Sequence, residues 1–454
     1  MDEPRGRALP RRTAALLAAV PLVAVLLADA TLVARHTTTE QVHRLPAHAA
    51  TGRSPQAGRA IDAARTRTLA LRALLARRGH AVLHHDRAEW LATVDPARPA
   101  FRRQQAATFD NMRDVPFSSW RYTFDPAHAQ LHYADVPRYR VPYWAPETFA
   151  LHYQLRGFDK EPTNLPQYPT FVRRAGRWYL TSLTDFAQEG MTSSRELWDY
   201  GPVAVVRRPR VLVLGHPSAS STMQVLAGEA EADIPRVTAV WGSHWSQRIV
   251  LLVPSTQREL ARVVDDFGDL DHIAAVATAE VQTHSGHPDP VGDRVGINPD
   301  NWPKLSPLGR QIVLAHEFTH VATRAVTGGA MPTWLAEGFA DYVGYLDSGV
   351  PTAFAAQELA TDVRAGHVPR RLPPDEQFDG ASKRLAQAYE AAWMACRLIA
   401  SRYGQGALVR LYRAVGTSTD NSKVAVDEAM ARVLHISTTR FVREWRDFLR
   451  GELS

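Results

Sequence analysis

The chain has 454 residues, 45% of them hydrophobic, with a formal net charge of +6; this predicts a globular protein of two or three domains. The basic residues are scattered and form no patch interleaved with aromatics, so we expect no nucleic-acid partner. A single cysteine, Cys396, excludes an intrachain disulfide and a zinc site built on cysteines.

The first 35 residues have the features of an export segment. Several arginines precede an apolar run from Thr13 to Ala28. Ala28-Asp29-Ala30 fits a small-x-small cleavage site, whereas continuation through Ala34 makes the run almost long enough to span a bilayer. We therefore expect residues 1–35 to be a signal peptide or a membrane anchor. Both alternatives predict an extracytoplasmic protein, either secreted or anchored by one N-terminal helix.

Residues 36–60 are rich in Thr, His, Ala, Gly and Pro and are predicted to form a linker. Residues 61–186 show helical patterns followed by alternating strands, which predicts a separate α+β domain. The expected helices cover 64–83, 88–94 and 101–112, and the expected strands cover 120–124, 131–133, 148–155, 170–172 and 177–183.

The order of these elements resembles a known fold. Trp90-Leu91 precedes Val94-Asp95, and Gly176-Arg177-Trp178-Tyr179 closes a hairpin, as in NTF2-like or cystatin-like cones. The resemblance implies helices packed on one curved antiparallel sheet. Some cones of this kind house a small-molecule site, and many serve only as scaffolds.

Residues 187–209 are polar, with several charges, and are predicted to form a second linker. A second domain is expected from residue 210 to residue 450, and its first part has a βαβ-like pattern. The expected strands cover 211–214, 248–253, 273–278 and 294–298, and the expected helices cover 218–232 and 255–264.

The strongest chemical signal is His316-Glu317-x-x-His320, set among uncharged residues. Positions i and i+4 share a helical face, so both imidazoles can bind one metal ion, Zn²⁺. Glu317 reaches the space in front of that metal, where a general base for a bound water must stand. Helix boundaries agree, with Ser306 as the predicted N-cap and an end after Thr327.

A second helix, opened by Pro332, completes the predicted metal site. Glu337 and Asp341 form another i, i+4 pair on one of its faces. Glu337 can supply the third ligand, which leaves a fourth position open for water, as in catalytic rather than structural zinc sites. Asp341, one turn further on, is placed to orient a ligating imidazole through its free N–H.

The two motifs together resemble the gluzincin metallopeptidases, most closely the bacterial peptidase-MA-like domains. They are His316-Glu317-x-x-His320 and Trp334-Leu335-x-Glu337-Gly338-Phe339-Ala340-Asp341-Tyr342. The resemblance covers about residues 205–450 and implies a zincin fold with a β-containing upper lobe and a helical C-terminal lobe. It also implies that the strand before the zinc helix, at 295–297, is the sheet edge. A G-x-M-E-N sequence, by which aminopeptidases of this clan hold a free amine, is absent.

The resemblance further implies a tyrosine, on a helix after the third ligand, that stabilises the oxyanion. Tyr389 is the candidate, and His367 and His435 are rival donors. Tyr389 also falls on an apolar helical stripe, so a purely structural role in the core stays open. The helices expected in this lobe cover 382–403, 407–415, 424–433 and 438–449.

These features predict an extracytoplasmic zinc-dependent peptidase that acts on a peptide or protein substrate. One alternative is a membrane-associated interaction protein whose zinc site is structural or vestigial, although a structural site has no need of Glu317. Another alternative is a gluzincin hydrolase of a non-peptide bond. The sequence does not indicate an oligomeric state.

Overall fold

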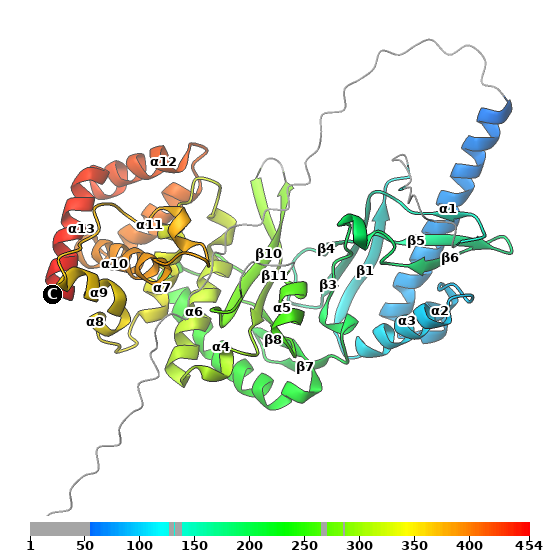
Figure 1. The fold of residues 1–454 in the computed structure, drawn as a ribbon, viewed down its shortest axis with the longest axis horizontal. Helices are drawn as coiled ribbons and strands as arrows, with labels where there is room; N and C mark the ends of the chain where they lie inside the picture. The colour runs from blue at the N-terminus through cyan, green and yellow to red at the C-terminus, as the bar shows by residue number, and fades with distance from the viewer. Residues whose placement is uncertain (1–54, 127–130, 132–138, 265–269, 285–286) are drawn as a thin grey trace, which may run out of the picture.

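The computed structural model describes residues 55–126, 131, 139–264, 270–284 and 287–454. The predicted signal peptide or anchor (1–35) lies outside these residues, as does most of the predicted linker 36–60. Among the residues described, no helix is both long enough and apolar enough to cross a membrane. Figure 1 shows an N-terminal lobe at one end, a sheet in the middle and a helical lobe at the other end.

The N-terminal lobe begins with three helices, as predicted. Helix α1 starts at Pro55, inside the segment predicted as a linker. The bounds of the helices are α1 Pro55–Leu83, α2 Arg87–Ala92 and α3 Pro99–Asn111. The strands that follow are β1 Phe117–Phe124, β2 Tyr143–Trp144, β3 Phe149–Leu155, β4 Thr163–Pro166, β5 Thr170–Arg174 and β6 Arg177–Ser182.

The expectation of one curved sheet in this lobe is wrong. The strands form two separate three-stranded antiparallel sheets, ordered β1-β3-β4 and β2-β5-β6. Pro166 ends β4 and Pro169 precedes β5. Because β5 pairs with β2 on one side and β6 on the other, it has no free edge for β4, and the prolines mark the turn from one sheet to the next.

The middle of the molecule is a five-stranded sheet in the order β10-β11-β9-β8-β7. Strands β8 and β9 are parallel and joined by α4, which confirms the predicted βαβ pattern. The bounds are β7 Ala204–Arg207, β8 Val211–Gly215, α4 Ser220–Trp241, β9 Ile249–Val253, α5 Gln257–Val263, β10 Ala275–His284 and β11 His287–Ile297.

Two expectations about this sheet are corrected. The edge strand is β10, and β11 lies between β10 and β9, so the strand just before the zinc helix is not the edge. Antiparallel pairing continues from Ala275↔Ile297 to His284↔His287, so the hairpin extends well beyond the strands expected at 273–278 and 294–298. The stretch predicted as a second linker, 187–209, contains strand β7 and the buried residues Leu197 and Trp198.

Both faces of the central sheet are buried at β8 and β9, whose residues carry no polar side chain and are buried at every position. Val213 and Leu251 face the helices α4 and α6 (Pro307–Thr323). Leu214 and Leu252, one residue along each strand, face an aromatic cluster of the N-terminal lobe that includes Trp198. Since successive strand residues point to opposite sides, one sheet joins both lobes through continuous apolar cores.

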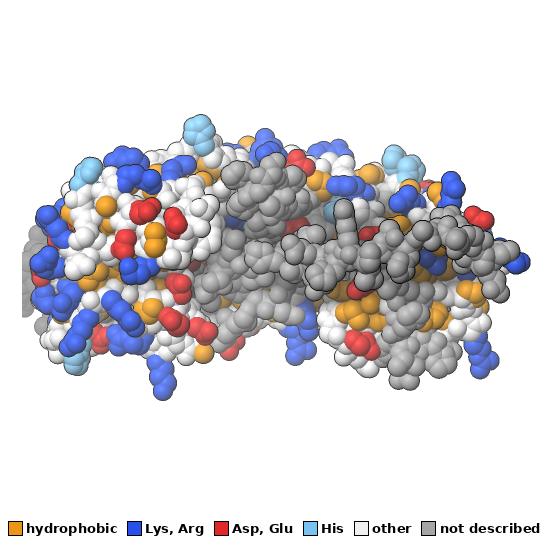
Figure 2. Space-filling model, turned by 90° about the horizontal axis from the view of Figure 1, so that it is seen from above, with side chains coloured by type: hydrophobic (Ala, Val, Ile, Leu, Met, Phe, Trp, Pro, Cys, Tyr) orange, Lys and Arg blue, Asp and Glu red, His pale blue; other side chains and the backbone are white. Residues whose placement is uncertain are grey.

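The helical lobe carries the predicted helices with shifted ends. A π-helical turn, Met430–Leu434, follows α12. The bounds are α7 Thr333–Tyr345, α8 Thr352–Ala355, α9 Gln357–Arg364, α10 Leu385–Tyr403, α11 Gln405–Gly416, α12 Ser422–Ala429 and α13 Thr438–Leu453. On the face seen in Figure 2, lysine and arginine side chains are dispersed among acidic and neutral ones.

Candidate metal centre

Helix α6 carries the first two residues of the site. Its N-terminus has the predicted cap, because the Ser306 hydroxyl accepts a hydrogen bond from the Gly309 N–H at 3.1 Å. The α-helix ends at Thr323 and a 3₁₀ turn continues to Val326, so the predicted end at Thr327 is slightly late. The helix is buried on all sides from residue 312 onward, which holds its polar side chains away from water.

Helix α7 lies unusually close to its neighbours, and glycines allow this. A Cβ on Gly338 would lie 2.4 Å from the Ala392 carbonyl oxygen of α10. A Cβ on Gly344 would lie 2.8 Å from the Ile312 carbonyl oxygen of α6. Side chains at either position would push the helices apart. The close approach at Gly344 therefore helps to bring α7, which carries Glu337, to the histidines of α6.

Three side-chain atoms converge between α6 and α7. The Nε2 atoms of His316 and His320 are 2.9 Å apart. The Oε2 atom of Glu337 is 3.2 Å from His316 Nε2 and 3.4 Å from His320 Nε2. Tetrahedral coordination with bonds of about 2.0–2.1 Å separates ligand atoms by about 3.3 Å. The three atoms thus have the mutual spacing that one zinc ion would bridge.

The chemistry of these atoms also fits a cation. Asp341 Oδ1 lies 2.9 Å from His316 Nδ1, and in a neutral ring that bond needs the proton on Nδ1 and leaves a lone pair on Nε2. Within the described chain, Glu337 Oε2 is buried without a hydrogen-bond partner. Buried lone pairs that face one another are costly unless a positive charge lies between them.

The surrounding charges favour a positive charge at the same point. Burial lowers the pKa of His316, but Asp341 and Glu337 outweigh burial and raise it to about 10. Burial raises the pKa of Glu337, but His320 and His316 outweigh burial and lower it to about 2. A proton on the imidazole is one source of that charge, and a divalent metal ion is another.

Glu317 contacts the edge strand of the sheet. The residue is 3% exposed, and its carboxylate accepts a hydrogen bond from the backbone N–H of Ala277 in β10. Burial raises the pKa of Glu317, while His316 and His320 act in the opposite direction. A buried carboxyl group whose pKa is raised can take up a proton and later release it, as a general base must do.

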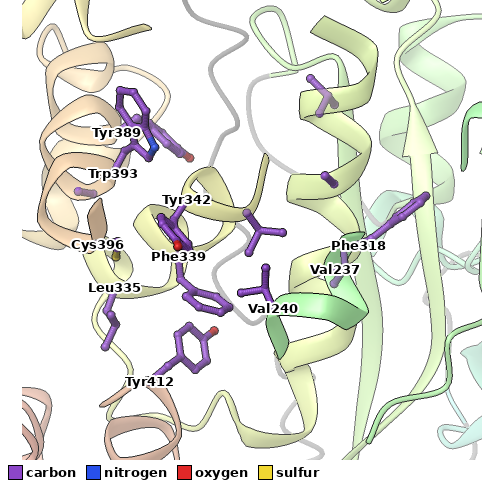
Figure 3. Packing of buried hydrophobic residues seen from close by; sticks show 14 of the residues in the cluster. Val237, Val240, Phe318, Leu335, Phe339, Tyr342, Tyr389, Trp393, Cys396 and Tyr412 are labelled. Atoms are coloured by element: carbon purple, nitrogen blue, oxygen red, sulfur yellow. The ribbon is translucent and has the colours of Figure 1, made fainter. Parts of the chain in front are cut away.

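The structure places Tyr389 in the apolar core of the helical lobe, where Figure 3 shows it on α10 near Trp393. Its ring is 6% exposed and meets Phe378 edge-on, with ring centroids 5.2 Å apart. The rival donors His367 and His435 are both exposed and follow α9 and the π-helical turn. A role for Tyr389 at the site remains a prediction.

The predicted apolar stripe on α10 is confirmed, because all of its members are buried. They are Leu385, Tyr389, Ala392, Cys396 and Ile399. Figure 3 shows Phe339 of α7 extending toward Tyr412 of α11, and their ring centroids are 4.9 Å apart. The contact between Phe339 and Tyr412 packs α7 against α11.

Sequence reasoning missed the contact between Ala277 and Glu317. A backbone N–H carries no residue signature, and Ala277 lies 40 positions before Glu317. Only the pairing of β10 at the sheet edge brings that N–H to the helix. The one available signal was the apolar strand pattern near residue 275, which predicts a strand but not its neighbour.

No family model and no curated protein matches the sequence. Among solved structures, the chain is similar to the M1 zinc metallopeptidase from Deinococcus radiodurans, with 16% identity and a TM-score of 0.34 over 61% of this chain and 58% of that one. It is also similar to native yeast LTA4 hydrolase, with 11% identity and a TM-score of 0.34 over 54% and 39% of the two chains.

The chain therefore spans less than two thirds of the length of these structures. A TM-score of 0.34 is too low to assign a fold or an activity.

Proposed function

We propose that this protein is an extracytoplasmic, zinc-dependent peptidase of gluzincin type. The observation that carries the proposal is the convergence of His316 Nε2, His320 Nε2 and Glu337 Oε2 at separations of 2.9–3.4 Å. These three residues would hold Zn²⁺ and leave a fourth position for water or substrate. Three ligands beside an intact Glu317 suit catalysis better than a structural role.

Bound zinc would polarise the scissile carbonyl and make a water molecule acidic enough to be deprotonated near neutral pH. The chain's own residues do the remaining work. Glu317 takes the proton from the attacking water and returns it to the leaving amine. Ala277 holds the Glu317 carboxylate through its backbone N–H, and Asp341 holds the His316 ring in one orientation. Tyr389 is the proposed donor to the oxyanion.

The extracytoplasmic location is proposed from residues 1–35, whose basic start and apolar run fit export. A reporter fused after residue 60 should be active only outside the cytoplasm. Mass spectrometry of the mature N-terminus distinguishes cleavage near Ala30 from an intact anchor. A reporter that stays cytoplasmic would refute this location and leave the metal-centre proposal untouched.

The decisive test compares the parent protein with Glu317→Gln on an unbiased peptide library, together with zinc analysis of both. The amide keeps the shape of the side chain but cannot take a proton from water. We expect zinc content to persist and turnover to fall by about 10²–10⁴-fold. Glu428→Gln, the same change at an exposed position on α12, is the matched control and should behave as the parent does.

Each outcome decides between the hypotheses. Equal peptide hydrolysis by the parent and Glu317→Gln would remove Glu317 as the base. Zinc in the parent without cleavage of any library peptide would favour a non-peptide substrate or a binding role.

A further inference from the structure

The N-terminal lobe contains a cavity far in the sequence from the metal centre. It opens to solvent, and the space inside it and at its mouth together measures about 560 Å³. Aromatic side chains form much of its wall, among them Trp90, Trp120, Tyr122 and Phe171. The lining of the cavity is thus of the apolar, aromatic kind that an aromatic ring packs against.

One wall of this cavity carries a buried cation, Arg78 of α1, which is 3% exposed. Its Nε donates to the Tyr122 hydroxyl at 3.2 Å and its Nη1 to the Thr93 hydroxyl at 3.0 Å. Its Nη2 donates to the Gln105 side-chain oxygen. The guanidinium carbon also lies 3.3 Å from the centroid of the Trp90 ring.

All of these partners are neutral. In the part of the chain that the structure describes, no carboxylate forms an ion pair with Arg78. Three of its five N–H groups make the bonds above, which leaves one N–H on each terminal nitrogen. A buried charge without a counter-ion is costly, and an arginine fork matches the two oxygens of a carboxylate.

Acidic residues also line the cavity, but they have other partners. Glu196 accepts a hydrogen bond from the Tyr153 hydroxyl at 2.8 Å. Asp199 accepts from the Glu196 N–H at 3.1 Å and lies 3.7 Å from an Nη atom of Arg195. Among the described residues, neither acid forms a hydrogen bond or an ion pair with Arg78, whose side-chain bonds go to Tyr122, Thr93 and Gln105. The positive end of the cavity therefore stays without a counter-ion.

We propose that this cavity binds a small aromatic carboxylate, with the carboxylate on Arg78 and the ring among the aromatic side chains of the wall. The ligand supplies the negative charge that the chain does not. The site is separate from the metal centre and does not depend on the peptidase proposal.

The test uses benzoate, phenylacetate and 3-phenylpropionate, each compared with its own amide, on the purified full chain. Binding is followed by tryptophan fluorescence, because Trp90, Trp120 and Trp198 line the cavity, and by the shift in Tm. We expect at least one acid to bind about 10-fold or more tightly than its amide, the usual value of a hydrogen-bonded charge. All titrations are repeated with EDTA, which separates this cavity from a carboxylate bound to zinc.

Variants locate the site. Arg78→Gln should reduce acid binding about 10-fold or more and leave amide binding nearly unchanged. Arg72→Gln, the same change at an exposed position of α1, is the matched control. The acid-to-amide comparison in the parent keeps the proposal testable if Arg78→Gln does not fold. Equal binding of acids and amides, no binding of any probe, or acid binding lost with EDTA would each overturn it.

Discussion

The metal centre and the N-terminal cavity are two buried polar centres that favour ligands of opposite charge. At the metal centre, lone pairs of His316, His320 and Glu337 face one another at 2.9–3.4 Å, an arrangement that a cation would stabilise. In the cavity, Arg78 is a buried cation whose hydrogen-bond partners are neutral. Buried charge is normally compensated, so each centre indicates the sign of the ligand that would complete it.

A third buried centre shows what internal compensation looks like. Arg294 of β11 pairs with Asp159 of the N-terminal lobe, with Nη1 and Oδ1 2.7 Å apart and both side chains buried. The Arg294 guanidinium also reaches the hydroxyls of Tyr153 and Thr163. Because this cation has its counter-ion within the chain, we assign it a structural role between the lobes. The contrast separates structural charges from candidate binding sites.

The largest expected effect concerns the metal centre. His320→Ala removes one of three ligands and should lower zinc affinity by more than 100-fold, since losing even an indirect partner costs about 10–100-fold. Elemental analysis after dialysis measures the retained metal. His435→Ala, an exposed histidine of the same lobe, is the control and should keep its zinc. Full zinc in His320→Ala would show that the bound zinc is not held by these three ligands.

Tyr389→Phe tests whether a residue of the apolar core also serves the reaction. Removing a donor to the oxyanion should lower kcat about 10²-fold while zinc content and fold persist. Tyr412→Phe removes a hydroxyl that lies 3.2 Å from the Thr323 hydroxyl, and it should affect stability rather than kcat. Unchanged kcat in Tyr389→Phe would return that residue to the core and direct attention to His367 and His435.

Asp341→Asn tests whether the carboxylate that holds His316 matters for the cation. The amide can still accept a bond from Nδ1 but loses the charge, and zinc affinity should fall about 10–100-fold. Competition with a chelator of known affinity measures the change. Asp347→Asn, just beyond α7, is a control for the loss of one acid. Equal zinc affinity in Asp341→Asn and the parent would show that the charge of Asp341 does not contribute to zinc binding.

At the cavity wall we expect the free energy of unfolding to depend on pH through Glu196. Burial raises the pKa of Glu196 to about 7, Arg294 and Tyr153 oppose this, and Asp199 and Asp159 add to it. The folded protein therefore holds this proton more tightly than the unfolded chain does. Stability from this group is complete below about pH 4.5 and is lost as the pH rises to about 7, by at most about 1.4 kcal/mol per pH unit.

In Glu196→Gln, which has no carboxyl group at this position, the free energy of unfolding should not show this fall between pH 4.5 and 7. Urea unfolding of parent and variant between pH 4.5 and 8 gives the difference in unfolding free energy, in which other titrating groups largely cancel. We expect the variant to become more stable relative to the parent as the pH rises. A constant difference across the range would mean that Glu196 is ionised in the folded protein throughout.

Local patterns were enough to predict several parts of the fold. The spacing of His316 and His320 places them on one helical face wherever the helix lies, because 3.6 residues make one turn. Ser306 and Pro307 mark the start of that helix through their own backbone preferences. Glu337 and Asp341 follow the same rule on α7. Such features depend on neighbours within a few residues, so the sequence carries them directly.

The sequence could not decide which strands are neighbours or how α7 approaches α6. The division of the N-terminal strands into two sheets, the edge position of β10 and the Ala277 bond to Glu317 depend on pairing between distant segments.

By itself, then, the sequence determined which residues can act as metal ligands and which helices carry them, because helical periodicity is local. Only the tertiary structure decided that three ligand atoms meet within 3.4 Å of one another and that Arg78 lies buried without a counter-ion. In the sequence, nothing distinguishes Arg78 from the other arginines of α1. Its burial comes from α2, α3 and β1 folding over it, and no pattern within α1 encodes that packing.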